Sequence, residues 1–201
     1  MTLDSFRHMA RVAAHLPDVP QAHTYQRLAW WLRHALLSRA VGVRMGQDVR
    51  IDARFYFPKG LQLRLDSGVH IKRDVRIGRE HASSNSGGLT IGQQTQVLSD
   101  ARIDCTASVA IGAGSHLGRG AVVYTHRHAV DKRDVGVLDA PIEAKPVEIG
   151  NDVMIYSDVV ILSGIHIGDG AIIGVRSVVT KDVAPYAVMA GVPATKVGER
   201  V

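Results

Sequence analysis

Residues 149–184 read IGNDVM, IYSDVV, ILSGIH, IGDGAI, IGVRSV and VTKDVA, and these six consecutive hexads decide the fold. Each hexad opens on an aliphatic residue and carries a small or aliphatic residue four places later. A helix repeats near 3.6 residues and a strand near 2, so a strict period of six fits neither as one long element. It fits a chain that alternates short strands with turns, since Gly, Asn, Asp and Ser accept turn conformations. We therefore predict an all-β fold, a parallel β-helix of stacked coils.

The same phase appears earlier in the chain and is interrupted twice. The aliphatic residues that open the earlier hexads are Leu65, Ile71, Ile77, Ile91, Val97, Ile103, Ile111, Leu117 and Val123. The phase is lost over residues 79–88 and again over 124–146. Long excursions from a regular scaffold are usually functional or disordered. We predict a β-helix over residues 45–184 with a loop inserted at 124–146.

The segments on either side of the repeats are predicted to close the ends of the β-helix. Residues 1–44 form an N-terminal helical segment, because apolar residues recur at three- and four-residue spacing over 24–40 without Pro or Gly. A solenoid needs its open end covered, so we expect this helix to be a cap. Contact with a lipid surface is the alternative, since Trp30 and Trp31 lie among arginines. Residues 185–201 are a C-terminal strand and tail, with 186–194 extended along the prism.

Composition describes a single domain with a substantial core. The chain has 201 residues, of which 46% are hydrophobic and 5% aromatic, which suits a narrow prism filled by aliphatic side chains. It has one cysteine, Cys105, and no apolar run approaches the roughly 18 residues of a membrane span. No signal sequence is evident, so we expect a cytoplasmic protein. The net charge is +5, but the basic residues are scattered, which argues against nucleic acid and fits a small phosphorylated ligand equally well.

Three motifs resemble the hexapeptide-repeat acyltransferases of the left-handed β-helix superfamily, especially the maltose, galactoside and polysaccharide O-acetyltransferase branch. They are the hexads, YTHRHAVD at 124–131 and VVTKDVAPYAVMAGVPATKV at 178–197, and the resemblance covers about residues 89–197. It implies a left-handed coil, although crossovers are usually right-handed. It also implies a homotrimer that binds acetyl-CoA in grooves between neighbouring subunits, with no metal.

The resemblance implies that a histidine of the inserted loop acts as the general base. An ungapped count from Ile111 places the base at His128, and His126 is the second candidate. Imidazole titrates near neutrality and can take the proton of an attacking hydroxyl or amine. Asp131 or Asp134 is expected to orient the imidazole.

Positions that match the cofactor site of this family lie in the last coils. They are Ser157, Val175, Thr180 and Lys181, and Arg176 and Lys196 are further candidates for binding the cofactor. Ser157 is expected near the thioester oxygen, where negative charge develops in the transition state. The backbone amide of Val175 is expected to hold the pantetheine arm, and Lys181 is expected to attract phosphate. Arg176 stands where the family often has a small residue, and Lys196 lies one place beyond a position that is often basic.

The acceptor is expected to be a sugar or glycan precursor with a hydroxyl or amine, and Asp104 is a candidate contact for a sugar hydroxyl. Two other functions stay open. One is a zinc hydratase of the gamma carbonic anhydrase type, whose ligands would be His81, His116 and His126 or His128. The other is a β-helix scaffold without catalytic activity.

Overall fold

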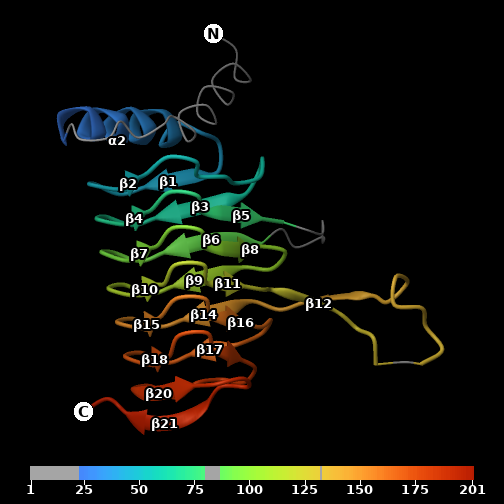
Figure 1. Cartoon of the computed structure of the whole chain (residues 1–201). Helices are drawn as coiled ribbons and strands as arrows, with labels where there is room; N and C mark the ends of the chain where they lie inside the picture. Colours follow the sequence, from blue (N-terminus) through green and yellow to red (C-terminus); the bar gives the residue numbers. More distant parts are fainter. Residues whose placement is uncertain (1–22, 80–86, 132) are drawn as a thin grey trace.

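In the computed structural model, residues 23–79, 87–131 and 133–201 can be described, and they form a left-handed parallel β-helix. Short strands stack coil upon coil into a three-sided prism (Figure 1). Each face of the prism is one sheet, named sheet A, B or C below. This confirms the all-β fold that the hexads predicted.

Sheet A contains β1 (Val43–Met45), β3 (Gln62–Leu65), β6 (Gly88–Ile91), β9 (Val109–Ile111), β14 (Val147–Ile149) and β17 (His166–Ile167). Sheet B contains β2 (Arg50–Ile51), β4 (His70–Ile71), β7 (Gln96–Val97), β10 (His116–Leu117), β15 (Met154–Ile155), β18 (Ile172–Ile173), β20 (Ala187–Ala190) and β21 (Thr195–Glu199). Sheet C contains β5 (Arg76–Gly78), β8 (Arg102–Asp104), β11 (Val122–Val123), β16 (Val160–Ile161) and β19 (Val178–Val179).

The core is a column of aliphatic side chains inside the prism. The first residue of each hexad points inward and is buried, as Ile149, Ile155 and Ile161 show. Parallel pairing stacks equivalent residues, so Ile149 lies between Ile111 and Ile167. Each turn needs one residue with a left-handed backbone, and the hexads supply Gly or Asp there in most coils. Arg176 takes that conformation with φ 57°, which explains why a small residue would suit its position.

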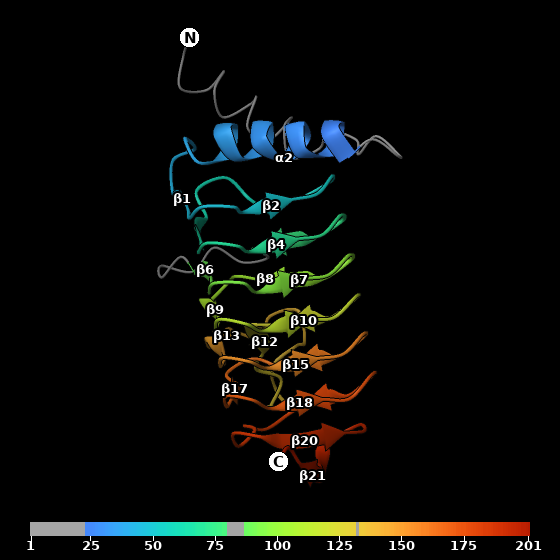
Figure 2. The same cartoon turned by 90° about the vertical axis from the view of Figure 1, so that its left-hand side faces the viewer.

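Helix α2 (His23–Leu37) lies across the first coil of the prism (Figures 1 and 2). Arg33 is fully buried and donates to the carbonyl oxygen of Ile51 at 2.9 Å. The indole Nε1 of Trp30 donates to the Asp52 carboxylate at 2.8 Å. The helix ends three residues before the expected limit of residue 40, and the first strand begins at Val43 rather than at 45. Within the described residues, no helix has the length and hydrophobicity needed to cross a bilayer.

The opposite end of the prism differs from the single extended strand expected over residues 186–194. Strand β20 continues sheet B beside β18, and the chain then reverses so that β21 pairs with β20 in antiparallel orientation. The reversal at Gly191, where φ is 100°, was not evident from the hexad pattern because the pattern ends at residue 184.

Candidate active site

The inserted loop leaves the prism as an antiparallel hairpin, β12 (His126–His128) with β13 (Ile142–Ala144) (Figure 1). It emerges where the chain passes from sheet C to sheet A. Side chains alternate along a strand, so His126 and His128 lie on one face of the hairpin and Arg127 lies on the other. The Arg127 guanidinium donates to Glu143 at 2.9 Å across the two strands, which holds the hairpin together.

His126 is paired with Asp104 of the preceding coil. Its Nδ1 lies 2.8 Å from the Oδ2 of Asp104, and the side chains of both residues are less than a tenth exposed. The same carboxylate accepts from the hydroxyls of Thr106 and Thr125, each at 2.7 Å, and from both of their backbone amides at 3.0 Å. The four hydrogen bonds from Thr106 and Thr125 fix the Asp104 carboxylate, and the carboxylate in turn fixes the position of the His126 imidazole.

These donors also fix the charge of Asp104 and the tautomer of His126. Burial alone would raise the pKa of the Asp104 carboxyl, but hydrogen bonds from Thr125, His126 and Thr106 outweigh burial and lower that pKa to about 2. Asp104 is therefore a carboxylate at neutral pH, and a carboxylate can only accept. The Nδ1 of His126 must carry the proton, which leaves the lone pair of the neutral ring on Nε2.

This geometry changes two of the expectations from sequence. Asp104 was expected to bind a sugar hydroxyl, but its oxygens already accept from Thr106, Thr125 and His126. Asp131 was expected to orient an imidazole, but its carboxylate accepts from Arg127 at 3.2 Å. The acid that orients a histidine is Asp104, and the histidine that it orients is His126. His128 is exposed, and its ring centroid lies 6.4 Å from that of His126 in an edge-to-face arrangement.

The residues expected to bind the cofactor lie along both edges of sheet C in the last coils. Ser157 and Arg176 are stacked on the edge between sheets B and C, where the amide of Arg176 donates to the carbonyl of Ser157 at 2.9 Å. Val175 is beside them and is 60% exposed. Thr180 and Lys181 follow β19 and are exposed on the edge between sheets C and A, from which the hairpin emerges.

Between those two edges, sheet C presents an apolar surface. Val122, Val160 and Val178 point outward from successive strands and are half-buried. Lys196 lies apart from this surface, on β21 of sheet B, and its ammonium pairs with Glu199 at 2.9 Å. The structure thus brings five of the six expected cofactor residues to the borders of one face.

Sequence reasoning missed two residues on the edge of the prism between sheets C and A, from which the hairpin emerges. Within the described part of the chain, the buried side-chain polar atoms that lack a hydrogen-bond partner are Nε and Nη2 of Arg79 and Oγ of Ser163. Arg79 follows β5 and Ser163 follows β16, so both lie where the chain leaves sheet C. Buried polar groups are normally paired, so unpaired ones call for an explanation. Their sequence signal was only their place one or two residues after a strand of sheet C.

The zinc site considered from sequence is not assembled among the described residues. His116 lies on β10 of sheet B, a different face from the hairpin, and His81 lies outside the described residues. The described residues hold no group of three histidine, cysteine or carboxylate side chains suited to a metal. Cys105 is buried, and burial raises the pKa of its thiol to about 12, so it is not a nucleophile at neutral pH.

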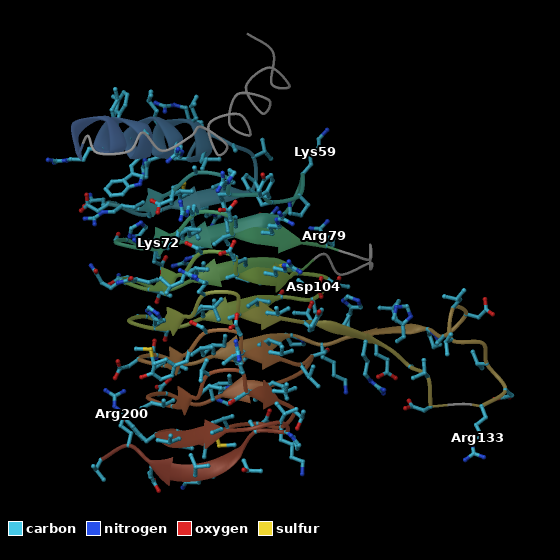
Figure 3. The ribbon with its side chains drawn as sticks, viewed as in Figure 1. Lys59, Lys72, Arg79, Asp104, Arg133 and Arg200 are labelled. Carbon is cyan, nitrogen blue, oxygen red and sulfur yellow. The ribbon has the colours of Figure 1, made fainter. Side chains whose placement is uncertain are left out.

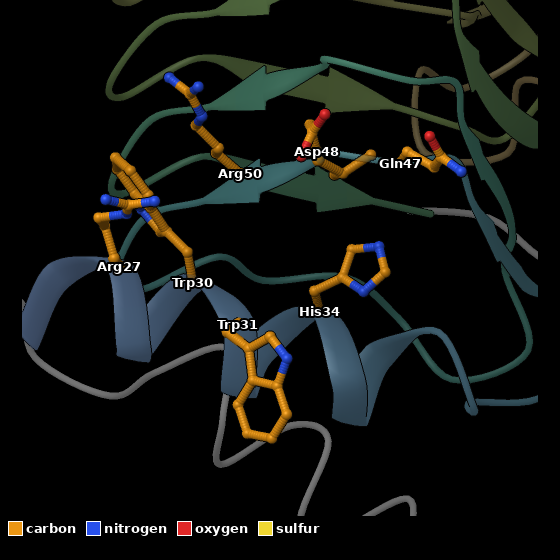
Figure 4. Close-up of a pocket in the computed structure, with 8 residues that line it drawn as sticks. Arg27, Trp30, Trp31, His34, Gln47, Asp48 and Arg50 are labelled. Carbon is orange, nitrogen blue, oxygen red and sulfur yellow. The ribbon is translucent and has the colours of Figure 1, made fainter. Parts of the chain in front are cut away.

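A cavity of about 800 Å³ lies between α2 and the first coil (Figure 4). Trp30, His34 and Arg50 are among the residues that line it, and the Arg50 guanidinium lies 5.4 Å from the Trp30 ring centroid. This cavity is at the helix-covered end of the prism, whereas the hairpin emerges from a coil near its middle (Figure 1). It is not part of the histidine site.

Comparison with known sequences supports the interpretation of the repeats. Residues 146–181 match the family described as bacterial transferase hexapeptide (six repeats). The chain is 56% identical over 63 residues to a chloramphenicol acetyltransferase of Morganella morganii, and the match covers 31% of this chain and 30% of that protein. It is 41% identical over 83 residues to a 2,3,4,5-tetrahydropyridine-2,6-dicarboxylate N-acetyltransferase of Staphylococcus aureus, covering 41% of this chain. The chain spans 30% of the length of each of these relatives.

Solved structures share the fold over almost the whole chain. A hexapeptide-repeat acetyltransferase from Vibrio cholerae, complexed with acetyl coenzyme A, has a TM-score of 0.62 at 22% identity over 98% of this chain and 86% of that one. A galactoside acetyltransferase in complex with coenzyme A has a TM-score of 0.62 at 24% identity, covering 98% and 82%. An N-acyltransferase from Bacillus cereus with dTDP and coenzyme A has a TM-score of 0.66 at 18% identity, covering 78% and 84%.

The fold and the matched repeats define a protein class, the left-handed β-helix proteins built of hexapeptide repeats. Within that class, residues 146–181 carry the hexapeptide repeat of bacterial transferases, and the chain is similar over part of its length to the acetyltransferases named above.

Proposed function

We propose that this protein transfers the acetyl group of acetyl-CoA to a hydroxyl or amine of a sugar or glycan precursor. The observation that carries the proposal is the pair of imidazoles on one face of a hairpin, the inner one held at 2.8 Å by the buried Asp104 carboxylate. The identity to two acetyltransferases over the repeats supports acetyl transfer. The names of those two relatives and of the galactoside enzyme give three different acceptors. They therefore support acetyl transfer more strongly than they support a sugar as the acceptor.

We assign the general base to His128 and a positioning role to His126. A base must reach the proton that it removes, and His128 is exposed whereas the His126 side chain is only 7% exposed. His126 is tied to the prism through Asp104, so it fixes where β12 leaves the body and hence where His128 lies. A second assignment, with the Nε2 of His126 as the base, is favoured by the carboxylate on its Nδ1 and is separated from the first by variants of each residue.

The reaction follows from these roles. The acceptor oxygen or nitrogen attacks the thioester carbonyl carbon while its proton passes to the imidazole of His128. The tetrahedral intermediate then collapses, the carbon–sulfur bond breaks, and the imidazolium returns the proton to the departing sulfur. The products are the acetylated acceptor and CoA with a free thiol.

Acetyl-CoA is proposed to lie along the apolar face of sheet C. Val160 and Val178 offer a surface for the pantetheine arm, and Ser157 stands at one edge of that surface. Lys181 stands at the other edge, where its ammonium attracts phosphate. A neighbouring subunit of a homotrimer would supply the other wall of the groove. With acetyl-CoA as the donor, a cytoplasmic location is part of the proposal.

The test is a screen of acetyl acceptors in which release of free CoA thiol is measured. Acetyl-CoA is mixed with the protein and with sugars, amino sugars or nucleotide sugars, and hydrolysis without acceptor is the blank. We expect at least one acceptor to raise thiol release well above the blank, with acetylated product visible by mass spectrometry. If acetyl-CoA and CoA both leave the melting temperature unchanged at millimolar concentration, the proposed activity is wrong, because a ligand of the native state must stabilise it.

A further inference from the structure

The edge of the prism between sheets C and A carries a vertical row of side chains, called the hairpin edge here. Parallel pairing aligns Ile77, Ile103, Val123, Ile161 and Val179 on five successive coils. The residues two places after each of these form the hairpin edge: Arg79, Cys105, Thr125, Ser163 and Lys181. The row therefore has the histidine hairpin at its centre, with Arg79 two coils toward α2 and Lys181 two coils toward the C-terminus.

The unpaired buried polar atoms of the described residues all lie on this edge. They are Nε and Nη2 of Arg79 and Oγ of Ser163, on opposite sides of the hairpin coil. Both residues lie on the edge that holds His126, where a bound ligand would supply the missing hydrogen-bond partners.

Asp104, the carboxylate on the coil adjacent to Arg79, does not pair with the Arg79 guanidinium. Gly78 is paired with Asp104, and the amide of Cys105 donates to the carbonyl of Gly78 at 2.8 Å, so Arg79 and Asp104 lie on adjacent coils. Figure 3 shows both at the edge from which the hairpin projects. The oxygens of Asp104 accept from Thr106, Thr125 and His126 instead. Arg79 is half-buried, and two buried N–H groups without an acceptor are unfavourable, so Nε and Nη2 are poised for an anion.

We propose that Arg79 binds an anionic group, a phosphate or a carboxylate, on the acetyl acceptor. A guanidinium presents two parallel N–H donors that match both of these anions, and Nε and Nη2 are the pair that form such a fork. The inference deepens the proposed function, since it names the class of acceptor as an anionic sugar derivative.

The spacing along the edge fits an acceptor of that size. The Arg79 coil and the hairpin coil are separated by two strand spacings, which is about 10 Å. A sugar that carries a phosphate or carboxylate at one end and the reactive hydroxyl or amine at the other spans a distance of this order. Lys181 lies a further two coils away on the opposite side of the hairpin, so the acceptor anion and the CoA phosphates would occupy separate places.

The test compares Arg79→Gln and Arg79→Lys with a matched control, Arg102→Gln. Arg102 is an exposed arginine on the next strand of sheet C, and it points outward from that sheet instead of lying on the hairpin edge. Binding of glucose 1-phosphate, glucuronate and glucose is measured by calorimetry without acetyl-CoA. We expect the wild type to bind at least one of the two anions and not glucose, and the preferred anion to show whether phosphate or carboxylate is recognised. Arg79→Gln should weaken that binding at least about tenfold, the effect of losing one charged hydrogen-bonded contact.

Arg79→Lys keeps the charge without the fork, so it should bind more weakly than the wild type and more tightly than Arg79→Gln. Arg102→Gln should bind as the wild type does. The inference is overturned if the wild type prefers neither anion to glucose, or if Arg79→Gln retains full affinity. It is also overturned if Arg79→Gln weakens acetyl-CoA instead of the sugar anion, because the guanidinium would then belong to the cofactor site.

A second measurement separates a binding role from a structural one. If Arg79 is held for a ligand, Arg79→Gln should melt no lower than the wild type without ligand, and should lose the stabilisation that the anion gives the wild type. A variant that melts several degrees lower without ligand would show that the guanidinium serves the fold. These binding measurements need no catalysis. Failure of the acetyl transfer screen with anion binding intact would therefore reject the proposed reaction and leave the anion site standing.

Discussion

The Nδ1 of His126 donates to the Oδ2 of Asp104 at 2.8 Å, although the two residues are 22 positions apart and lie on successive coils. This hydrogen bond joins the first residue of the inserted hairpin to the prism. It determines the tautomer of His126 and holds the first residue of β12 against the preceding coil, two residues from His128. Three predictions concern this link.

Asp104→Asn should lower both activity and stability. An amide in place of the carboxylate cannot accept from Thr106, Thr125 and His126 in the same way, and hydrogen bonds to a charged group contribute about 1.5–3 kcal/mol each at most. We expect a chemical step at least tenfold slower and a lower melting temperature, measured by single turnover and by thermal denaturation. Asp100→Asn is the control, because Asp100 is exposed and asparagine tolerates its φ of 65°. Equal behaviour of the two variants would contradict the role given to Asp104.

The two histidines should differ when each is replaced by alanine. His128→Ala should slow the chemical step by at least about 10²-fold, the lower end of general-base contributions, with little change in acetyl-CoA affinity. His126→Ala should slow it less and lower the melting temperature more, because it removes a buried partner of Asp104. Single turnover at saturating acceptor separates binding from chemistry.

If His126→Ala is the inactive variant and His128→Ala is active, the base is His126 and the assignment is reversed. If both variants keep the full rate, the hairpin is not the catalytic element.

Acid should remove the contribution of Asp104 to stability. Its pKa is lowered to about 2 in the folded protein, so this contribution is complete above the ordinary pKa near 4 and is lost as the pH falls from 4 to 2. The shift corresponds to roughly 2 kcal/mol of the free energy of unfolding. Denaturant titrations of the wild type and Asp104→Asn at pH 6 and at pH 3 isolate it, since other carboxylates cancel in the difference. The difference in unfolding free energy between the wild type and Asp104→Asn should be smaller at pH 3 than at pH 6. A difference that does not change with pH would show that Asp104 is not held as a carboxylate.

The stacked coils were predictable from sequence, and the pairing at the site was not. Every coil repeats the same local pattern, so the inward aliphatic residues such as Ile149 and Ile155 are visible in any one hexad. Whether Asp104 meets His126 or His128 depends on the register between coils and on the way the chain leaves the prism, and neither has a local signal. An ungapped count compares positions along the chain only, so it gives His128 as the base but cannot identify Asp104 as the partner of His126. The burial of Nε and Nη2 of Arg79 likewise depends on the coils beside it.

Lys181 should matter for the phosphates of CoA rather than for its pantetheine arm. Its side chain is exposed at the edge of sheet C, where an ammonium attracts phosphate through charge. Lys181→Ala is therefore expected to weaken CoA binding more than binding of a pantetheine fragment without the nucleotide, measured by calorimetry at low ionic strength. Lys59→Ala is the control, an exposed lysine near α2 (Figure 3). Equal losses for the two ligands would reject the role proposed for Lys181.

Apolar side chains are exposed on the outer part of the hairpin, and we predict that a second subunit covers them. Val137 and Leu138 are 68% and 94% exposed, and Val130 on the same hairpin is 53% exposed, although apolar side chains of this size are usually covered. A homotrimer, in which each groove lies between two subunits, would bury them and complete the wall beside sheet C. We expect light scattering to give three times the 21.7 kDa mass of the chain. Leu138→Asp should shift the protein toward monomer and weaken acetyl-CoA binding in parallel, whereas Val201→Asp at the exposed C-terminus should do neither. A wild-type monomer with full activity would show that one chain holds the whole site, and the hairpin would then need another explanation for its apolar end.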